Sequence, residues 1–363
     1  MSSPSPSYTT ARSRYLAAAN AAGATVETIT HPARGPDNEP LATDCAWLGP
    51  KDAAAVLLMV SATHGAEGHC GSGAQSAWLE RGEAGLVPPG VAVLMVHAIN
   101  PYGFAWNRRV TEDNVDLNRN WIDFAAPLPP PENPGYDELA DVILPAEWSD
   151  ASQAAYADRI KAYVAAHGEA AMMKAISGGQ YRHPQGIFYG GTAPTWSRTT
   201  LTAIFEQQLG RAAHIGIIDF HTGLGPSGYG EPIISAYAGS AIAMRAQARH
   251  GMSAIPIGSP ESASAELSGD WLGAAPAHMP NAEVTGIALE FGTVPTNKVI
   301  AALRADAWLH AHGDPLSPEG KAIRAQMLAA FYTDTDHWRG MVEGQSLIAA
   351  RQALAGLKLA IGA

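Results

Sequence analysis

Residues that can bind a metal stand directly after an apolar run near the start of the sequence. His64 and Glu67 follow Val56–Val60 at a spacing of three residues, inside the glycine-rich stretch THGAEGHCGSG. One imidazole and one carboxylate presented from a single turn are ligands that zinc accepts. The spacing alone is a weak signal, because a capping glutamate beside a turn histidine would give the same pattern.

A second histidine could complete this set. His221 follows the apolar run GIIDF, and Asp219 precedes it by two residues. Residues two apart on a strand share a face, so Asp219 could support the ligand from behind. A lone histidine there would more often be a satisfied core residue. Two histidines and one glutamate with an open fourth position are typical of catalytic zinc. We therefore expect one zinc ion per chain, held by His64, Glu67 and His221.

A third acidic residue lies within an apolar run. Glu290 stands in GIALEFGT, where a buried carboxylate is costly unless it is paired or near a metal. It could be an ion-paired core residue. A general base for a zinc-activated water fits better, because a low-dielectric site raises the pKa of a carboxyl group towards working pH.

The stretch NRRVTEDNVDLNRNW, residues 107–121, is dense in guanidinium and amide groups. Arg108, Arg109 and Arg119 present planar forks that match a carboxylate, and Asn118 adds a neutral donor. Alternatively, the three acidic residues of the same stretch neutralise the arginines within a solvated loop. The length and order of the pattern favour a functional site.

These residues need a framework that brings them together. Four apolar runs are continuous rather than alternating, which is the pattern of strands covered on both faces. They span residues 54–65, 91–103, 214–225 and 286–293. Helical stretches lie between them, so the sequence predicts a three-layer α/β/α fold with a mixed, largely parallel central sheet. Ligands of such sheets bind beyond the carboxyl ends of the strands, where these polar residues stand.

The rest of the chain is expected to complete one domain, residues 1–363. The sequence predicts a helix at 10–22, a strand hairpin within 24–49, further helices at 72–81 and 199–213, and two closing helices in a tail at about 318–363. An insertion at about 125–191 interrupts this alternation of strands and helices. It opens with the proline-rich APLPPPENPGY and continues with a helix near 151–176. We expect this insertion to form a wall of the site.

Composition narrows the class of protein. The 363 residues carry a net charge of −11, from 23 basic and 34 acidic side chains, which argues against a nucleic-acid partner. No apolar run approaches the roughly 18 residues that span a membrane, and the first 20 residues lack the pattern of a secretory signal. Cys45 and Cys70 are the only cysteines, so a disulfide framework is not expected. We expect a soluble, cytoplasmic protein and leave its oligomeric state open.

Four motifs together resemble the zinc carboxypeptidase superfamily over roughly residues 56–293. They are THGAEG, NPYGFAWNRRVTEDNVDLNRNW, DFHTGLG and ALEFGT. The segments HGAEG, followed by GSG, and EDNVDLNRN are similar to sequences of an uncharacterised bacterial branch of that superfamily. The resemblance implies a zinc carboxypeptidase-like fold and cleavage of a peptide bond next to a free carboxylate.

The resemblance also implies a role for each matching residue. His64, Glu67 and His221 would bind zinc, Arg108 or Arg109 would polarise the scissile carbonyl, Asn118 and Arg119 would hold the terminal carboxylate, and Glu290 would be the base. The family's mobile tyrosine has two candidates, Tyr229 and Tyr237, because both follow His221. The stretch between Glu67 and His221 is longer than in the digestive enzymes, so we expect a different pocket wall.

Two alternatives remain beside a carboxypeptidase. The motif DFHTG is similar to aspartoacylase and succinylglutamate desuccinylase, relatives that share the zinc set and cleave N-acyl amino acids. The expected partner is therefore a small peptide or an N-acyl amino acid. The second alternative is a protein without catalytic activity that keeps the fold as a carboxylate receptor.

Overall fold

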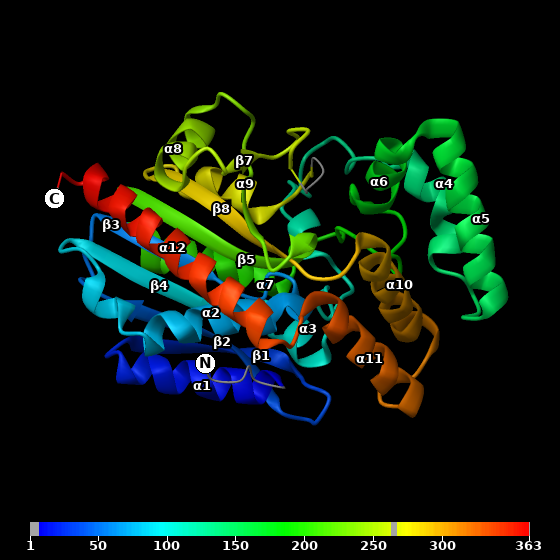
Figure 1. Ribbon diagram of the computed structural model, residues 1–363, viewed down its shortest axis with the longest axis horizontal. Helices are drawn as coiled ribbons and strands as arrows, with labels where there is room; N and C mark the ends of the chain where they lie inside the picture. The colour runs from blue at the N-terminus through cyan, green and yellow to red at the C-terminus, as the bar shows by residue number, and fades with distance from the viewer. Residues whose placement is uncertain (1–6, 263–266, 363) are drawn as a thin grey trace.

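The computed structural model describes residues 7–262 and 267–362, and an eight-stranded mixed sheet lies at its centre (Figure 1). The strand order is β1-β2-β4-β3-β5-β8-β6-β7. The strands are β1 (Thr25–Arg34), β2 (Pro40–Leu48), β3 (Ala55–Val60), β4 (Val91–His97), β5 (His214–Ser227), β6 (Gly230–Ile234), β7 (Ile255–Pro256) and β8 (Glu283–Gly292). The adjacent strands β4, β3, β5 and β8 run parallel, while β2 and β6 are antiparallel to their neighbours in this central group. The predicted mixed, largely parallel sheet is confirmed, with its four apolar runs as β3, β4, β5 and β8.

Twelve α-helices are present in the described ranges. They are α1 (Tyr8–Ala21), α2 (Gly68–Glu80), α3 (Pro101–Trp106), α4 (Pro134–Ile143), α5 (Asp150–His167), α6 (Glu169–Ser177), α7 (Trp196–Ile204), α8 (Ala241–His250), α9 (Trp271–His278), α10 (Thr296–His312), α11 (Pro318–Phe331) and α12 (Asp336–Ala360). In this described part, none of the helices combines the length and the apolar character that crossing a membrane requires. The predicted first helix and the two closing helices correspond to α1, α11 and α12.

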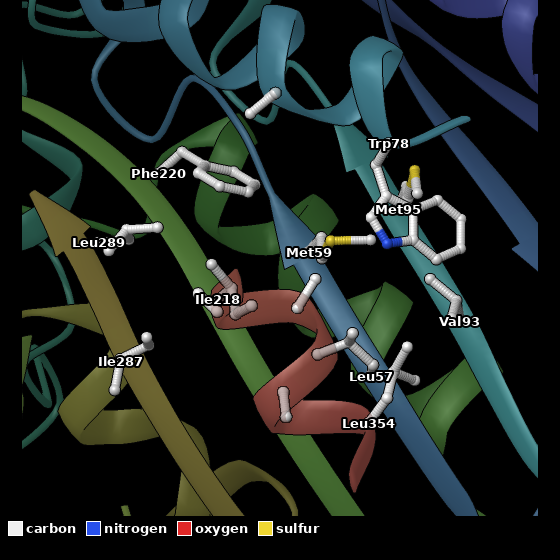
Figure 2. Close-up of a cluster of buried hydrophobic side chains, with 14 of the residues drawn as sticks. Leu57, Met59, Trp78, Val93, Met95, Ile218, Phe220, Ile287, Leu289 and Leu354 are labelled. Carbon is white, nitrogen blue, oxygen red and sulfur yellow. The ribbon is translucent and has the colours of Figure 1, made fainter. Parts of the chain in front are cut away.

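The two faces of the sheet carry separate cores, as strand alternation requires. Leu57 and Met59 of β3 pack with side chains of α1, α2, α8 and α12 on one face. Figure 2 shows this layer, with Leu354 of α12 and Trp78 of α2 against the strands. The intervening Leu58 packs on the opposite face with α7 and α9. The predicted three-layer α/β/α arrangement is therefore confirmed.

The region at 125–191 differs from its prediction in two places. The single helix expected near 151–176 is two helices, because Gly168 between them adopts φ +86°, which only glycine tolerates well. In addition, α4 begins at Pro134, inside the proline-rich stretch. Proline is well tolerated in the first helical turn, because the N–H that it lacks would have no hydrogen-bond partner within the helix there. Asn133 caps this turn by accepting a hydrogen bond from the Tyr136 amide at 3.1 Å.

The end of β5 also differs from its prediction. The sequence pattern predicts that His221 stands at the carboxyl end of its strand, but β5 continues to Ser227. Gly223 and Gly225, at φ +125° and +89°, let the chain shift register, so that Ser227 pairs with Gly292 of β8. His221 consequently lies within a paired strand, which fixes its backbone.

Candidate metal centre

The turn that carries His64 and Glu67 is held tightly against the Arg108–Arg109 segment. It follows β3 as a short 3₁₀ turn, Gly65–Glu67, that leads into α2. The amides of Gly65 and Ala66 donate to the carbonyls of Arg109 and Arg108 at 3.1 and 2.7 Å. A Cβ on Gly65 would lie 1.9 Å from the carbonyl carbon of Gly103, so only glycine fits there.

The three predicted metal ligands lie together. Nδ1 of His64 and Nδ1 of His221 each lie 2.9 Å from a different oxygen of Glu67. One donor atom from each residue lies within 4.8 Å of the other two, and all three side chains are buried. Residues from β5 and from the turn after β3 are thus brought to one point.

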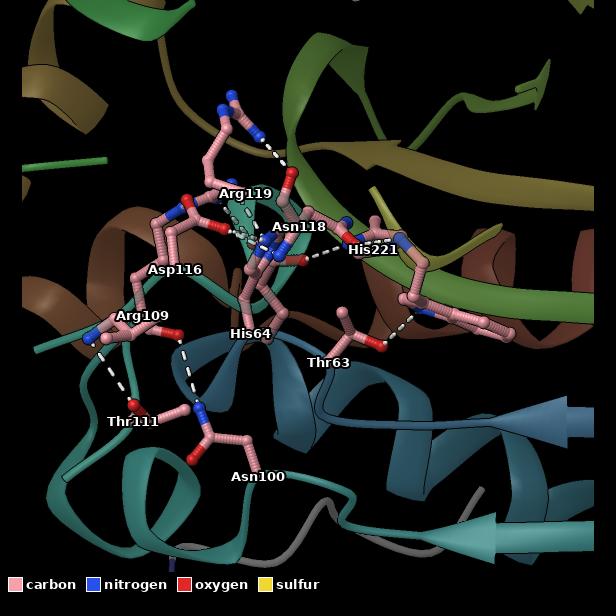
Figure 3. Close-up of polar contacts among 12 residues, drawn as sticks. Thr63, His64, Asn100, Arg109, Thr111, Asp116, Asn118, Arg119 and His221 are labelled. Carbon is pink, nitrogen blue, oxygen red and sulfur yellow. Dashed lines mark hydrogen bonds and ion pairs between the residues drawn. The ribbon is translucent and has the colours of Figure 1, made fainter. Parts of the chain in front are cut away.

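The outer nitrogen of each histidine faces a buried carboxylate. His221 Nε2 lies 2.6 Å from Asp219, which also accepts hydrogen bonds from Thr63 and from the Trp271 indole, both at 2.7 Å. His64 Nε2 lies 3.2 Å from Asp116 (Figure 3). Carboxylates behind ligating histidines are usual in metal sites, because they fix the ring and leave the inner nitrogen free to ligate.

The charges around the histidines favour a divalent cation. The site contains four buried carboxylates and two guanidinium groups: Glu67, Asp116, Asp219, Glu290, Arg109 and Arg119. Burial would raise the pKa of Glu67, but the two imidazoles outweigh burial and hold it well below its usual value. Burial would lower the pKa of His221, but Asp219 and Glu67 raise it well above normal. A divalent cation would compensate this excess of buried negative charge, and the donor set fits zinc.

Glu290 lies beside this centre on the neighbouring strand. It is paired in register with His221, and its Oε1 accepts the Leu224 amide at 3.0 Å. Burial and the charge of Glu67 raise the pKa of Glu290 to about 8. A cation bound at the triad would lower this pKa, because a nearby positive charge favours the carboxylate.

Of the two neighbouring arginines, the structure places Arg109 at the site. Its Nη1 lies 3.2 Å from Glu67, its Nη2 lies 2.9 Å from His64 Nε2, and its Nε donates to Asp116 at 2.9 Å. Arg108 instead donates to Asp306 of α10 at 3.0 Å. Burial opposes the positive charge of Arg109, but its acidic neighbours outweigh burial and raise its pKa.

Asn118 and Arg119 follow Asp116 on a short 3₁₀ turn. Asp116 accepts the Asn118 amide at 2.9 Å and so positions this turn. The Asn118 side-chain oxygen accepts the Trp271 amide at 3.4 Å. The Arg119 guanidinium donates to the carbonyls of Asn118 and Ser177 at 2.9 and 2.5 Å, while its Nε has no partner among the described residues. Within the same part of the chain it makes no ion pair, and burial lowers its pKa.

A cavity of about 130 Å³ connects these residues. The polar residues that line this cavity include the residues of the site described above, which are His64, Arg109, Asn118, Arg119, Asp219, His221 and Glu290. The apolar lining includes Met173 and Phe188 of the insertion, Val299, Ile300 and Leu303 of α10, Phe331 of α11, and Ile233 and Leu272 near the sheet. No tyrosine occurs among the described lining residues, and Tyr229 and Tyr237 are 42% and 69% exposed.

Several contributors to the site could not be recognised from spacing. Asp116 carries a weak signal, since it precedes Asn118 by two residues, but the sequence pattern indicates no more than a neutralising acid. Trp271 and Phe188 carry none, because each reaches the site through folding of distant segments. Thr63 adjoins His64, but its hydrogen bond to Asp219 cannot be recognised from spacing. Asn100, another polar residue after a strand, instead caps α3 by accepting the Gly103 amide at 2.9 Å.

The fold and the site together define an α/β protein with a His–Glu–His metal-site candidate at the carboxyl edge of its parallel strands. A family described as "Protein of unknown function (DUF2817)" matches residues 5–345, and the chain belongs to this family. This agrees with the uncharacterised branch that the motifs indicate. No curated protein matches the sequence.

Three solved structures illustrate what the chain is similar to. A putative metallopeptidase from Shewanella amazonensis SB2B is 12% identical, with 84% of this chain and 93% of that chain covered and a TM-score of 0.44. Carboxypeptidase A from Helicoverpa armigera is 13% identical, with coverage of 96% and 73% and a TM-score of 0.46. A succinylglutamate desuccinylase from Silicibacter sp. TM1040 is 14% identical, with coverage of 79% and 66% and a TM-score of 0.39.

Proposed function

We propose that this protein is a zinc-dependent hydrolase that cleaves an amide or peptide bond next to a free carboxylate. One observation carries the proposal: the buried guanidinium of Arg119, which makes no ion pair among the described residues, lines the same cavity as the His–Glu–His cluster. This guanidinium hydrogen-bonds backbone carbonyls and its Nε has no partner among the described residues, so it retains donor capacity that favours an anionic ligand. A carboxylate bound there would lie beside the metal centre.

His64, Glu67 and His221 would hold the metal, which supplies Lewis-acid activation of a water molecule when it is bound. Glu290 would take the proton of that water at its carboxylate and return it to the leaving amine. Arg109 lines the cavity and would stabilise negative charge on the carbonyl oxygen. Asn118 and Arg119 would bind the substrate carboxylate, since an amide and a planar fork match its geometry.

A deacylase of N-acyl amino acids remains the second candidate. The small cavity favours it, because about 130 Å³ accommodates a short acyl or side chain more readily than a long peptide. A receptor without catalytic activity is less well supported, because Glu290 places a carboxylate that can accept a proton in the same cavity as the cluster.

The test compares substrates with and without the carboxylate. Blocked dipeptides and N-acyl amino acids would be assayed as free acids and as C-terminal amides, with kcat/KM as the measurement. We expect amidation to cost roughly 2–4 kcal/mol, the scale for leaving a desolvated charge without its partner. Arg119→Ala should cost the free acid a similar amount and barely affect the amide. Arg119→Lys should recover only part, because an ammonium cannot reproduce the fork.

Arg182→Ala is the matched control. This arginine belongs to the insertion at 125–191, and its side chain is 69% exposed and pairs with Asp137. It should behave like the wild type with both substrates. Equal cleavage of free acids and amides by the wild type would refute the carboxylate requirement.

A further inference from the structure

The insertion contributes an aromatic residue to the site in an unusual backbone conformation. Phe188 adopts φ +55°, the left-handed region that bulky side chains rarely occupy. Its carbonyl accepts the Gln180 amide at 3.1 Å, and the next carbonyl, of Tyr189, accepts the Asp116 amide at 2.7 Å. The loop is thus hydrogen-bonded to the insertion and to the segment that carries Asn118 and Arg119. Strained backbone held by its surroundings in this way is often associated with function.

The side chain of Phe188 contacts both arginines of the cavity. The ring centroid lies 5.1 Å from Cζ of Arg109 and 5.4 Å from Cζ of Arg119, within the range of cation–π attraction. Phe188 is 6% exposed and lines the cavity. Two guanidinium groups this close to one ring repel each other, and the charge of Arg109 contributes, after burial, to the lowered pKa of Arg119. The attraction of each guanidinium group to the electron-rich π-system of this ring offsets that repulsion.

The rest of the insertion is also built around Arg119. The Ser177 carbonyl at the end of α6 accepts its Nη2, and the Tyr181 hydroxyl donates to its carbonyl at 2.6 Å. A Cβ on Gly179 would lie 2.6 Å from Cδ of Arg119, so the chain leaves room for the side chain to pass. Arg109 is oriented by two carboxylates, but Arg119 relies on carbonyls and on Phe188.

We propose that Phe188 is a positioning residue that holds Arg119 for a substrate carboxylate, so that the insertion takes part in carboxylate recognition. The inference rests on the proposed function, since it assigns to Arg119 the role of carboxylate ligand. Phe188 itself acts on the substrate only through the guanidinium groups that it orients.

The test replaces the ring and measures carboxylate recognition in two ways. Phe188→Leu keeps an apolar side chain and removes the ring, while Phe188→Tyr keeps the ring. With free-acid substrates, Phe188→Leu should raise KM at least tenfold, and with the matching amides KM should change less than twofold. Phe188→Tyr should recover most of the difference. Phe124→Leu is the control, because Phe124 makes the same kind of contact with Arg198 away from the cavity.

A second readout needs no turnover. Binding of N-acetylphenylalanine and of its amide would be measured by calorimetry on the wild type and on each variant. The wild type should prefer the carboxylate, and Phe188→Leu should lose that preference while its melting temperature and zinc content stay close to wild type. If hydrolysis is absent but this pattern holds, the proposed function fails and the role of Phe188 stands. Equal carboxylate preference in wild type and Phe188→Leu, or no preference in the wild type, would overturn the inference.

Discussion

At the scale of single residues, two buried glutamates of one site have opposite pKa shifts. Glu67 lies between two imidazoles, which keep its pKa below the usual value, whereas burial and the charge of Glu67 raise the pKa of Glu290 to about 8. Both side chains are buried, so their partners rather than the depth of burial separate these two pKa values, in the direction that the proposed roles require. A ligand has to be ionised, while a base has to take up and release a proton near neutral pH.

Replacing Glu290 by glutamine tests its assignment as the base. The amide is nearly the same size but cannot accept the proton, so kcat should fall by about 10²–10⁴-fold while zinc content and melting temperature are retained. Glu283→Gln, on the same strand and 37% exposed, should leave kcat unchanged. Turnover of Glu290→Gln within a few-fold of wild type would remove Glu290 from the mechanism.

At the scale of elements, a glycine determines how the ligand-bearing turn meets α3. Gly65 has no room for a Cβ against Gly103, whereas a Cβ on Gly73 in α2 would meet no atom within 4 Å. Gly65→Ala should therefore displace the turn and weaken zinc binding. Gly73→Ala should stabilise the protein by roughly 0.4–1 kcal/mol, because it removes freedom from the unfolded chain only. Urea unfolding and chelator competition would measure the two effects.

The opposite ranking would contradict this account of the turn. If Gly65→Ala bound zinc as tightly as the wild type and Gly73→Ala were the destabilised variant, the close contact between the turn and α3 would not support the site.

Elements with a strong pattern could be predicted from the sequence, and those defined by contacts could not. The four central strands were recognisable because a short, continuous apolar run is typical of a strand that is covered on both faces. The closing helices also agree with the structure. The break at Gly168 and the start of α4 at Pro134 depend on local backbone preferences that the broad pattern hides. The ring of Phe188 reaches the site because its loop is hydrogen-bonded to distant segments. The spacing of residues along the sequence does not indicate such contacts.

For the whole molecule, buried histidines predict sensitivity to acid. Burial lowers the pKa of His97 to about 4, and burial likewise lowers the pKa values of His250 and His310 to about 4 and 3. Their unfolded values lie near 6.5. Because the unfolded chain binds these protons first, stability is full above pH 6.5 and is lost as pH falls towards 4. For His97 alone the loss is on the order of 3 kcal/mol.

Unfolding by urea at pH 7, 6 and 5 would measure this dependence. His97→Gln should flatten the slope between pH 6.5 and 4, although it costs some stability at pH 7 through the lost contacts with Ser72 and Tyr15. A slope unchanged by the substitution would show that folding does not lower the pKa of His97.

The turn after β3, strand β5 and the segment after β4 converge on the candidate metal centre, so the proposed function depends on this centre most directly. The most direct test is the zinc content per chain, measured by elemental analysis of the wild type and of His64→Ala, His221→Ala and His183→Ala purified in parallel. His183 also faces a carboxylate, of Asp137 at 2.7 Å, but lies outside the cluster. We predict about one zinc per chain in the wild type and in His183→Ala, and almost none in the other two. Stoichiometric zinc bound with unchanged affinity by both His64→Ala and His221→Ala would contradict the account.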